Sequence, residues 1–502
     1  MIAVTVPIET PSVDLWAIAP ILALVGGGVG VVLVKALMRR HRAVTPVAFA
    51  LSLVSLVVAG FLLWHQWDLV RGDGPFSSMA GMVRLDPFAV FIGIVVGIAT
   101  AMALLLSYSY LRREQLEAPE YFALMLLSAS GMLMMAVAND LVAVFVALEV
   151  LSIPLYVLAA FDRRRLTSQE AGLKYFILGA FSSAIFLYGI AMVYGGTGTT
   201  SLTGIADFLA RNTLYEQATL LAGIGLLLVG LGFKVAAVPF HMWTPDVYQG
   251  APTPVTAFMA TATKAAGFAA LLRIVLVAFP QYHDDWQPVV WVLAALSMLV
   301  GSIAAIAQHD VKRILAYSSI AHAGYILMAV YADTSRGREA ALLYLFIYTF
   351  MAVGAFAVIT VLSHHGDADH TLDGYRGLAL RRPVLGGLLI FFVLAQAGIP
   401  LTGGFIGKLE IFASVAQAKD YVLLVIGVLA AVIATFFYLR IVMTLVSAPD
   451  DGAEVTGDAA PSRRRVDGWV GIVIGASAVM VLLVGVAPGT FIHFARDAVF
   501  FL

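Results

Sequence analysis

Long apolar runs dominate this sequence and decide what it can fold into. Fourteen stretches of about 18 or more mostly apolar residues follow one another, with short polar connections between them. Their centres are Leu22, Val54, Val95, Leu127, Val146, Phe186, Leu228, Ala265, Leu296, Ala323, Val353, Val393, Ala430 and Val479. Because each stretch is continuously apolar and does not alternate at every second residue, it predicts an α-helix and not a strand of a β-barrel. We therefore expect an all-α polytopic membrane protein with about 14 transmembrane helices.

The composition excludes several kinds of chemistry for this chain. Charged residues make up 12% of the 502 residues, about half of the share that is typical of soluble domains. A net charge of -1 without a basic tail argues against nucleic acid as a partner. The chain has no cysteine, which excludes iron–sulfur ligation, thiolate metal sites and disulfides within it. Any redox chemistry must therefore belong to a partner chain.

The basic residues between the spans predict the orientation in the membrane. Eighteen of the 30 Lys and Arg residues fall in or beside the connections from odd to even spans: Lys35, Arg39, Arg40, Arg42, Arg112, Arg113, Arg163, Arg164, Arg165, Lys174, Lys312, Arg313, Arg376, Arg381, Arg382, Arg463, Arg464 and Arg465. Seven fall in the other connections: Arg71, Arg84, Arg211, Arg336, Arg338, Lys419 and Arg496. Because cytoplasmic loops carry the excess of Lys and Arg, we expect both termini outside.

Five basic residues lie within the predicted spans: Lys234, Lys264, Arg273, Lys408 and Arg440. A lysine at the bilayer centre costs about 2.5 to 3.5 kcal/mol on insertion scales. A basic residue near the end of a span avoids this cost by extending to the headgroups, which fits Arg273 and Arg440.

Proline and glycine surround two of these lysines. Lys234 precedes Pro239, and Lys408 follows Pro400 and several glycines. These residues predict interrupted helices, which a membrane tolerates only against protein or a water-filled cavity. Lys234 and Lys408 are therefore expected to face a hydrated interior.

One acid and one histidine lie at a similar depth. Beside Lys234 the carboxylate of Glu149 and the lysine could both stay ionised, either for proton transfer or as a static ion pair between helices. His322 fits a proton relay, although a hydrogen-bonded core histidine explains it equally well. With Lys264 and Lys408 they form a titratable set without metal-ligand spacing, which favours proton transfer.

Haem and metal binding are less favoured. A haem-carrying subunit needs paired histidines inside the bundle, and His322 has no evident mate. His364, His365 and His370 could bind a metal ion, but a solvated polar loop is the better interpretation of that segment.

A longer motif surrounds Lys234. Between Gly232 and Val255 it contains Lys234, Pro239, His241, Trp243, Pro245, Asp246, Gly250, Ala251, Pro252, Thr253 and Pro254. Shorter motifs surround Glu149 (Leu-Glu-Val-Leu-Ser-Ile-Pro), Asp310 (Asp-Val-Lys-Arg-Ile-Leu-Ala-Tyr-Ser-Ser) and Lys408 (Gly-Phe-Ile-Gly-Lys). In these motifs the chain resembles the antiporter-like membrane subunits of respiratory complex I.

The branch of this family can also be inferred. The run Asp-Val-Tyr-Gln-Gly-Ala-Pro-Thr-Pro-Val, which begins at Asp246, resembles subunit N, whereas subunits L and M have other residues there. Lys408 also separates the chain from subunit M, which has Glu at this place. The resemblance therefore indicates the subunit N branch of bacterial NADH-quinone oxidoreductase.

The resemblance implies a particular fold. The family has two inverted five-helix repeats, spans 4 to 8 and 9 to 13, with broken helices 7 and 12. The chain would divide into residues 1–112 with helices 1 to 3, 113–280 with the first repeat, 281–446 with the second repeat, and 447–502 with a loop and helix 14. The repeats are not chemically identical, because span 10 carries His322 where span 5 carries Glu149, and span 13 carries Arg440 where span 8 carries Lys264.

The resemblance also implies redox-driven proton translocation in the bacterial inner (plasma) membrane. Glu149 and Lys234 would form the input pair, Lys264 the connecting group and Lys408 the exit group, with His322 as a further proton-transfer group. NADH, FMN, iron–sulfur clusters and quinone would bind to partner subunits, and no cofactor to this chain. The neighbouring antiporter-like subunit M, the small subunits J and K, and lipids would be its partners.

Two other classes of protein remain open. A subunit of a multisubunit cation/proton antiporter would share the same lysines, and neighbouring genes for flavin and iron–sulfur subunits would argue against it. A purely structural membrane subunit would keep the fold but would tolerate neutral replacements of the buried charges.

Overall fold

The structure is a computed structural model that describes residues 13–38, 43–214, 217–363, 366–367, 370–448 and 466–499. Within these residues the chain is mostly helical, and the only sheet is the antiparallel hairpin of β1 (Phe76–Ser78) and β2 (Val83–Leu85). The expectation of an all-α fold is confirmed. Several residues used in the predictions lie outside the described part: Arg39, Arg40, Arg42, His364, His365, Arg463, Arg464 and Arg465.

The long helices coincide with the predicted spans. In chain order they are α1 (Ala19–Leu37), α2 (Val44–Gly72), α3 (Pro87–Arg113), α4 (Glu120–Val137), α5 (Leu141–Ala159), α6 (Leu166–Thr197), α8 (Ala218–Val235), α10 (Thr253–Arg273), α11 (His283–Ile306), α12 (Val311–Ala332), α13 (Ser335–Leu362), α15 (Pro383–Ala397), α17 (Tyr421–Val446) and α18 (Gly468–Val486). Each of the fourteen predicted centres lies in one of these helices.

Shorter helices connect or extend the long ones. They are α7 (Leu202–Arg211), α9 (Trp243–Gly250), α14 (Leu378–Arg381), α16 (Gly403–Gln417) and α19 (Pro488–Val499), with the 3₁₀ or π segments η1 (Leu15–Ile18), η2 (Ile274–Ala278), η3 (Pro280–Tyr282) and η4 (Asp373–Tyr375). By length and composition, 13 of the described helices could cross a membrane, or 14 if the bent pair of α14 and α15 is one span.

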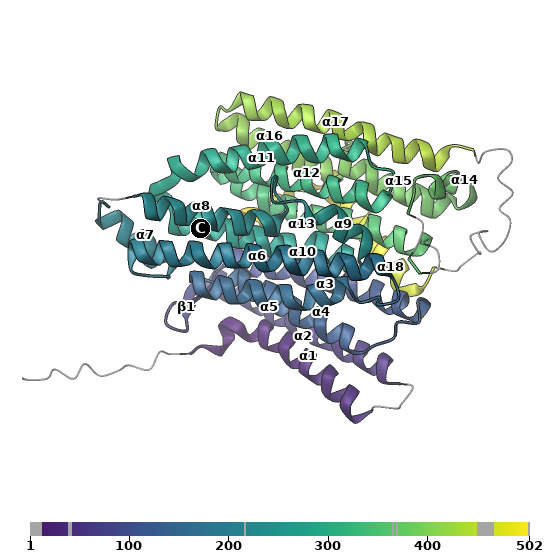
Figure 1. Ribbon diagram of the computed structural model, residues 1–502, viewed down its shortest axis with the longest axis horizontal. Helices are drawn as coiled ribbons and strands as arrows, with labels where there is room; N and C mark the ends of the chain where they lie inside the picture. The colour runs from purple at the N-terminus through teal and green to yellow at the C-terminus, as the bar shows by residue number, and fades with distance from the viewer. Residues whose placement is uncertain are drawn as a thin grey trace, which may run out of the picture.

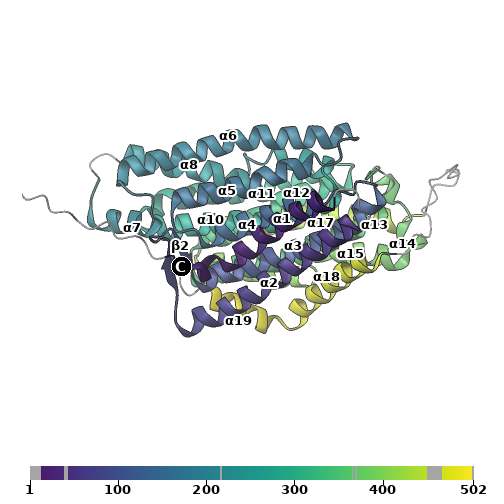
Figure 2. The ribbon, with the colours of Figure 1, turned by 90° about the horizontal axis from the view of Figure 1, so that it is seen from below.

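The helices run side by side along one direction, with α1 and α2 at one edge of the view and α17 at the opposite edge (Figure 1). Seen from below, α6 and α8 lie along one side and α18 and α19 along the other (Figure 2). In the central helices α10, α12 and α13, 89% of the apolar span is buried, against 33% in α1, α17 and α18. The outer helices therefore expose apolar side chains on the surface of the bundle, and the central helices are shielded by protein.

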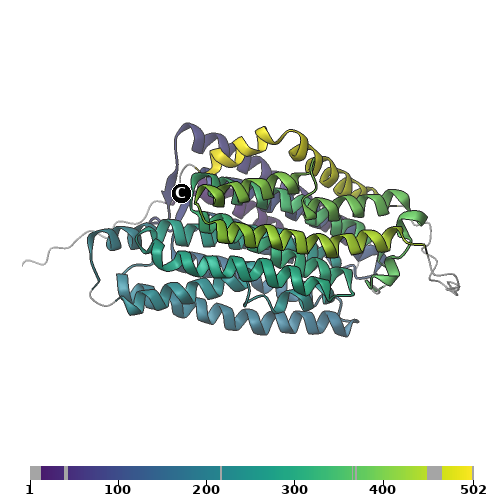
Figure 3. The ribbon, with the colours of Figure 1, turned by 90° about the horizontal axis from the view of Figure 1, so that it is seen from above.

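The first and last described segments lie at the same end of the bundle. The backbone N–H of Asp14 donates to Ser78 Oγ of the hairpin at 2.9 Å, and Asp497 pairs with Arg71 at the end of α2 at 3.2 Å. Figure 3 shows the yellow C-terminal helices beside the purple N-terminal ones. We call this end the hairpin end. The opposite end, which contains Arg165 and Asp367, is the loop end.

Candidate functional site

The helix that carries Lys234 is interrupted immediately after it. Helix α8 ends at Val235, the next residue has a left-handed backbone with φ of 63°, and α9 begins at Trp243. Side chains form hydrogen bonds with backbone groups that the interruption leaves unpaired. Val238 N–H donates to Ser297 Oγ at 2.9 Å, and the Trp243 indole N–H donates to the Phe233 carbonyl at 3.1 Å. The break is tolerated because it is packed against protein.

The ammonium group of Lys234 is held by a hydroxyl group. Lys234 Nζ donates to Ser152 Oγ at 2.8 Å and lies 5.8 Å from the centre of the Tyr175 ring. Glu149 lies one turn before Ser152 on α5, and its Oε1 is buried without a hydrogen-bond partner in the described residues. Within the described part of the chain, Glu149 and Lys234 form no ion pair. Lys234 is therefore held by Ser152 in place of the expected direct pair with Glu149.

A second interruption lies beside Lys408. Helix α15 ends at Ala397 and α16 begins at Gly403. Lys408 Nζ donates to the carbonyls of Gln396 and Ala397 at 3.0 and 2.8 Å, so it caps carbonyl groups that a helix end leaves unpaired and that carry partial negative charge. A Cβ atom at Gly404 would collide with the carbonyl oxygen of Ala395, so the close approach of α16 to α15 requires glycine there.

Lys264 and His322 lie between the two interruptions. Lys264 on α10 donates to the backbone carbonyl of Ser319 on α12 and lies 5.9 Å from the centre of the Tyr348 ring. On the same helix as Ser319, His322 hydrogen-bonds through Nδ1 to the Tyr344 hydroxyl at 2.7 Å. All four titratable groups, Lys234, Lys264, His322 and Lys408, are at most 5% exposed.

Hydrogen bonds connect His322 to the side chain of Gln396, the residue whose backbone carbonyl holds Lys408. His322 Nε2 is 3.1 Å from the Tyr438 hydroxyl, which is 2.5 Å from Ser318 Oγ. Ser318 Oγ donates to Gln396 Oε1 at 3.3 Å, and the backbone carbonyl of Gln396 accepts from Lys408. Ser318, Gln396 and Tyr438 were not predicted from the sequence, because nothing in their local sequence shows that α12, α15 and α17 meet here.

Lys234 and Lys264 approach one another without a shared hydrogen bond among the described residues. Gly267 lies one turn after Lys264 on α10, and a Cβ atom there would be 3.4 Å from Cγ of Lys234. The four groups are thus arranged in the order Lys234, Lys264, His322 and Lys408 across the centre of the bundle.

The two halves of the chain contain matching contacts. Isolated antiparallel bridges join Asp140 to Ser201 and Asp310 to Thr371, so each bridge closes a segment of the same length. Glu149 and Ser319 each follow their bridge aspartate by nine residues, and Ser152 and His322 each follow it by twelve. By its distance from the bridge aspartate, Ser319 matches Glu149, and His322 matches Ser152. Glu149 and His322 lie on the fifth and tenth of the long helices, as the sequence predicts.

The two arginines in the spans also match by contact. Arg273 Nε donates to the carbonyl of Ala136 at 2.8 Å, and Arg440 Nη1 donates to the carbonyl of Ile306 at 2.6 Å. Each of these carbonyls lies four residues before a bridge aspartate. Arg273 is also buried in an ion pair with Asp86 at 2.7 Å. The expectation that Arg273 extends to the headgroups is wrong, and by this contact Arg440 resembles Arg273.

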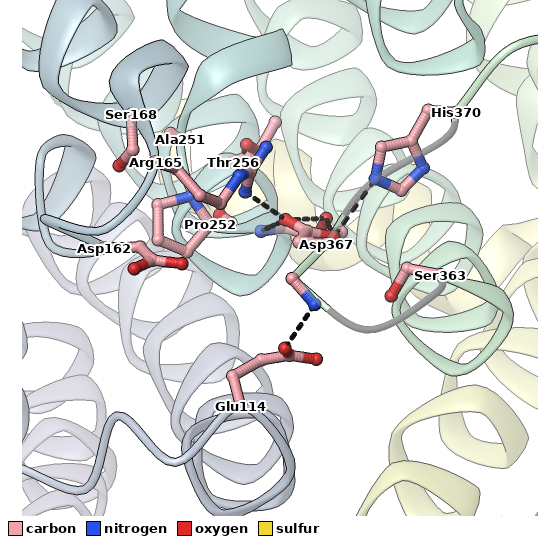
Figure 4. Close-up of polar contacts among 12 residues, drawn as sticks. Glu114, Asp162, Arg165, Ser168, Ala251, Pro252, Thr256, Ser363, Asp367 and His370 are labelled. Atoms are coloured by element: carbon pink, nitrogen blue, oxygen red, sulfur yellow. Dashed lines mark hydrogen bonds and ion pairs between the residues drawn. The ribbon is translucent and has the colours of Figure 1, made fainter.

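A buried carboxylate that the sequence analysis did not identify lies at the loop end (Figure 4). Asp367 accepts hydrogen bonds from the N–H and Oγ1 of Thr253 at 3.0 and 2.8 Å, and it lies 3.1 Å from His370 Nε2 and 3.4 Å from Lys312 Nζ. Burial by itself raises the pKa of Asp367, but the charge of Lys312 and the bond to His370 outweigh it and hold the pKa well below its usual value. Asp367 therefore caps the first turn of α10 and joins it to α12. His370 is engaged in this cluster and not in a solvated loop.

A membrane bundle with two interrupted helices, a buried lysine at each break and further polar groups between them defines an ion-translocating membrane protein. Residues 138–434 match the family model described as NADH:quinone oxidoreductase/Mrp antiporter, transmembrane. The chain is 43% identical to the NADH-quinone oxidoreductase subunit N of Trichlorobacter lovleyi, over 89% of this chain and 90% of that one. It is 41% identical to the subunit N of Rhodococcus opacus, over 100% and 98% of the two chains.

Solved structures agree with the sequence comparisons. A chain of respiratory complex I from Thermus thermophilus with bound aureothin matches with a TM-score of 0.79 and 34% identity, over 95% of this chain and 99% of that one. A chain of the Mrp complex from a Dietzia species matches with a TM-score of 0.84 and 22% identity, over 96% and 97%, which shows the shared fold alone. The chain belongs to the NADH:quinone oxidoreductase/Mrp antiporter transmembrane family, and the resemblance found in its motifs is confirmed.

Proposed function

We propose that the chain is the proton-translocating subunit N of a bacterial NADH-quinone oxidoreductase. The observation that carries the proposal is the row of buried titratable groups from Lys234 to Lys408, which crosses the bundle between two interrupted helices. NADH, FMN, iron–sulfur clusters and quinone bind to partner subunits, where the redox chemistry takes place. This chain contributes to the enzyme by moving protons.

Glu149 is the group that receives the signal from a neighbouring subunit. Its side chain is half-buried, and it lies on α5 beside the exposed residues Val146 and Val150. A membrane subunit packed on this face would contact the carboxylate directly. The partners we propose are the small subunits J and K and the antiporter-like subunit M, with lipids around the remaining surface.

The change in charge then passes through the bundle in a defined order. Gain or loss of charge at Glu149 acts on Lys234, Lys264 connects the two halves, and the proton passes by way of His322 to Lys408, the exit group. Two unit charges more than 4 Å apart, as Glu149 and Lys234 are, interact by less than about 4 kcal/mol at an effective dielectric constant of 20. Moving a charge against the membrane potential costs about 2.3 kcal/mol per 100 mV, which is of the same order.

The chain lies in the bacterial plasma membrane, with the loop end in the cytoplasm and both termini outside. The excess of basic residues in the odd-to-even connections supports this orientation, and both described ends of the chain lie at the hairpin end. Reporter fusions after Arg163 on the α5–α6 connection are expected to report the cytoplasm. A reporter placed there that is active outside would reverse the topology. We further propose that residues 113–280 and 281–446 form the two inverted repeats, which the matching bridge contacts support.

The decisive test uses Lys408. Lys408→Arg retains a positive charge but cannot release a proton, because the pKa of Arg exceeds about 12. We expect Lys408→Arg and Lys408→Ala to lose most NADH-driven proton uptake in sealed vesicles at equal content of complex. Lys419→Arg, at an exposed position, is the matched control and should pump normally. Normal uptake by Lys408→Arg together with loss in Lys408→Ala would leave Lys408 only a fixed charge.

A cation/proton antiporter is distinguished by its partners. The proposed subunit should purify from the membrane together with NADH-oxidising subunits. Purification with antiporter subunits alone, without NADH oxidation, would favour the antiporter.

A further inference from the structure

Four lysines of the chain are buried, and one of them differs from the other three in its partner. Lys312 Nζ lies 3.4 Å from the carboxylate of Asp367, so a formal negative charge balances its positive charge. Lys234, Lys264 and Lys408 donate to a hydroxyl group or to backbone carbonyls, and within the described part of the chain none of them forms an ion pair. Because a buried charge without a counter-charge is costly, these three ammonium groups need another source of negative potential.

A tyrosine ring lies over each of the three ammonium groups that lack an ion pair. The distances from Nζ to the ring centre are 5.8 Å for Lys234 over Tyr175, 5.9 Å for Lys264 over Tyr348 and 5.1 Å for Lys408 over Tyr325. All three tyrosines are buried, and each belongs to a helix other than the one that carries its lysine. Among the described residues no aromatic ring lies over Lys312. The lysine with a carboxylate therefore lacks a ring, and the lysines with a ring lack a carboxylate.

Two of these rings also flank His322. The ring centre of Tyr348 is 4.9 Å from the centre of the imidazole, and that of Tyr325 is 6.2 Å from it. Since Tyr348 lies under Lys264 and Tyr325 under Lys408, the rings follow the row of titratable groups through the second half of the bundle.

An aromatic ring and a carboxylate stabilise a cation in different ways. The face of the ring is electron-rich and attracts an ammonium ion, more strongly where water is excluded. The face carries no formal charge, and it has no lone pair that could take the proton from the lysine. A carboxylate in the same place would become an uncompensated buried charge whenever the lysine lost its proton.

We propose that Tyr175, Tyr348 and Tyr325 are positioning residues whose ring faces stabilise the ammonium form of the three lysines in the row. This inference rests on the proposed function and names the groups that balance the charge while a proton resides on each lysine. When the proton leaves, the attraction between ring and cation disappears and no buried anion remains. Each lysine can therefore be charged and neutral in turn at a site that holds no formal charge of its own.

Tyr325 offers the sharpest test, because its ring is the nearest to an ammonium group. Tyr325→Phe removes the hydroxyl, which donates to the Gly427 carbonyl at 3.4 Å, and keeps the ring, whereas Tyr325→Leu removes the ring as well. In sealed vesicles with equal amounts of assembled complex, we expect near-normal NADH-driven proton uptake with Phe and a loss of about threefold or more with Leu. An equal loss in both variants would make the hydroxyl the active group and would overturn the proposal.

A second series keeps the shape of the ring and changes only its electrons. Phenylalanine with one, two or three fluorine atoms on the ring is incorporated in place of Tyr325 in the full-length chain. Fluorine withdraws electrons from the ring face, so uptake should fall with each added fluorine, by about threefold or more in total. A packing role predicts equal uptake throughout the series. The control is trifluorophenylalanine in place of Phe122, a buried ring that packs against Phe49 without a cation over it among the described residues, and it should pump normally.

Tyr175 tests the proposal independently at the first break. Its hydroxyl is buried without a hydrogen-bond partner in the described part of the chain, so Tyr175→Phe breaks no hydrogen bond. We expect normal uptake in Tyr175→Phe and a loss in Tyr175→Leu that is smaller than in Tyr325→Leu, because this ring is farther from its lysine. Equal uptake in Tyr175→Phe and Tyr175→Leu would overturn the role of this ring.

The outcomes separate the role of the rings from the function. Normal uptake in Tyr325→Leu and throughout the fluorine series, with uptake lost in Lys408→Arg, would overturn the role of the rings and leave the proposed function standing. Normal uptake in Lys408→Arg and Lys408→Ala would overturn the proposed function itself. Equal losses from trifluorophenylalanine in place of Tyr325 and in place of Phe122 would show general damage and would also overturn the role of the rings.

Discussion

The two interrupted helices each contain a buried lysine, but different groups hold the two ammonium ions. At the first break the ammonium of Lys234 is held by a side chain, the hydroxyl of Ser152, near the carboxylate of Glu149. At the second break the ammonium of Lys408 is held by two backbone carbonyls at the end of α15. A side-chain partner can rotate and respond to a neighbouring charge, whereas backbone carbonyls are fixed by the helix. The two breaks are thus alike in the backbone and different in the groups that hold the lysine, which fits the proposed input role of the first half and exit role of the second.

The largest effect should come from removing either lysine, which tests whether both halves are needed. Lys234→Ala and Lys408→Ala are each expected to lower proton uptake per NADH oxidised at least tenfold, because each leaves a break without its titratable group. The measurement is proton uptake in sealed vesicles, normalised to assembled complex, with Lys419→Ala as the surface control. Full uptake in one of the two variants would mean that only one half carries protons.

A second prediction compares Asp367 with Thr197, which precede the two bridge residues by the same distance in sequence. Asp367 lies four residues before the bridge residue Thr371, and Thr197 lies four before Ser201. Asp367→Asn should lower the free energy of unfolding by about 3 kcal/mol, because it removes the carboxylate partner of the buried Lys312. Thr197→Val should cost only about 1 kcal/mol.

The stabilisation of the fold by Asp367 depends on pH in a defined direction. Because the folded-state pKa of Asp367 is lowered, its stabilisation is complete above the ordinary Asp pKa of about 3.9 and is lost as the pH falls through the folded-state value. Thermal unfolding of the detergent-solubilised complex at pH 7 and at acidic pH measures both effects. Equal melting temperatures for Asp367→Asn and Thr197→Val at pH 7 would contradict the stabilising role of the Asp367 carboxylate.

A third prediction concerns the charge at the first break. Glu149→Gln should reduce proton uptake about tenfold while the complex still assembles, because the amide keeps the shape but cannot present a charge to Lys234. Ser319→Ala is the comparison variant, because Ser319 follows Asp310 by as many residues as Glu149 follows Asp140. Normal uptake by Glu149→Gln would leave Glu149 a structural group, and the first half would then lose its input role.

The smallest effect is expected from the hydrogen-bond chain of the second half. Tyr438→Phe removes the hydroxyl between His322 and Ser318 and should lower uptake about threefold. Tyr188→Phe, at an exposed position, is the control. An unchanged rate in Tyr438→Phe would show that His322 acts by another route or only as a core histidine.

The spans and the lysines could be predicted from the sequence, because a long apolar run and a lysine within it are local signals. The breaks beside Lys234 and Lys408 were also marked locally, by proline and glycine. The partners of these lysines could not be predicted from the sequence. Ser152 is distant in sequence from Lys234, and it is one of many small polar residues in apolar spans. Asp367 was missed for the same reason: only the tertiary structure shows that a short polar loop folds back onto α10 and α12.

The shielding of the central helices has a consequence for biogenesis. Helices α10 and α12 carry Lys264 and His322, and they are among the least apolar of the spans. A nascent helix of this kind partitions poorly into lipid by itself, because nothing yet covers its charged and polar groups. They must therefore be retained at the insertion machinery until neighbours such as α11 and α13 arrive. Premature chain termination after α12 should accordingly yield a product that is degraded, whereas termination after α6 should yield one that stays in the membrane.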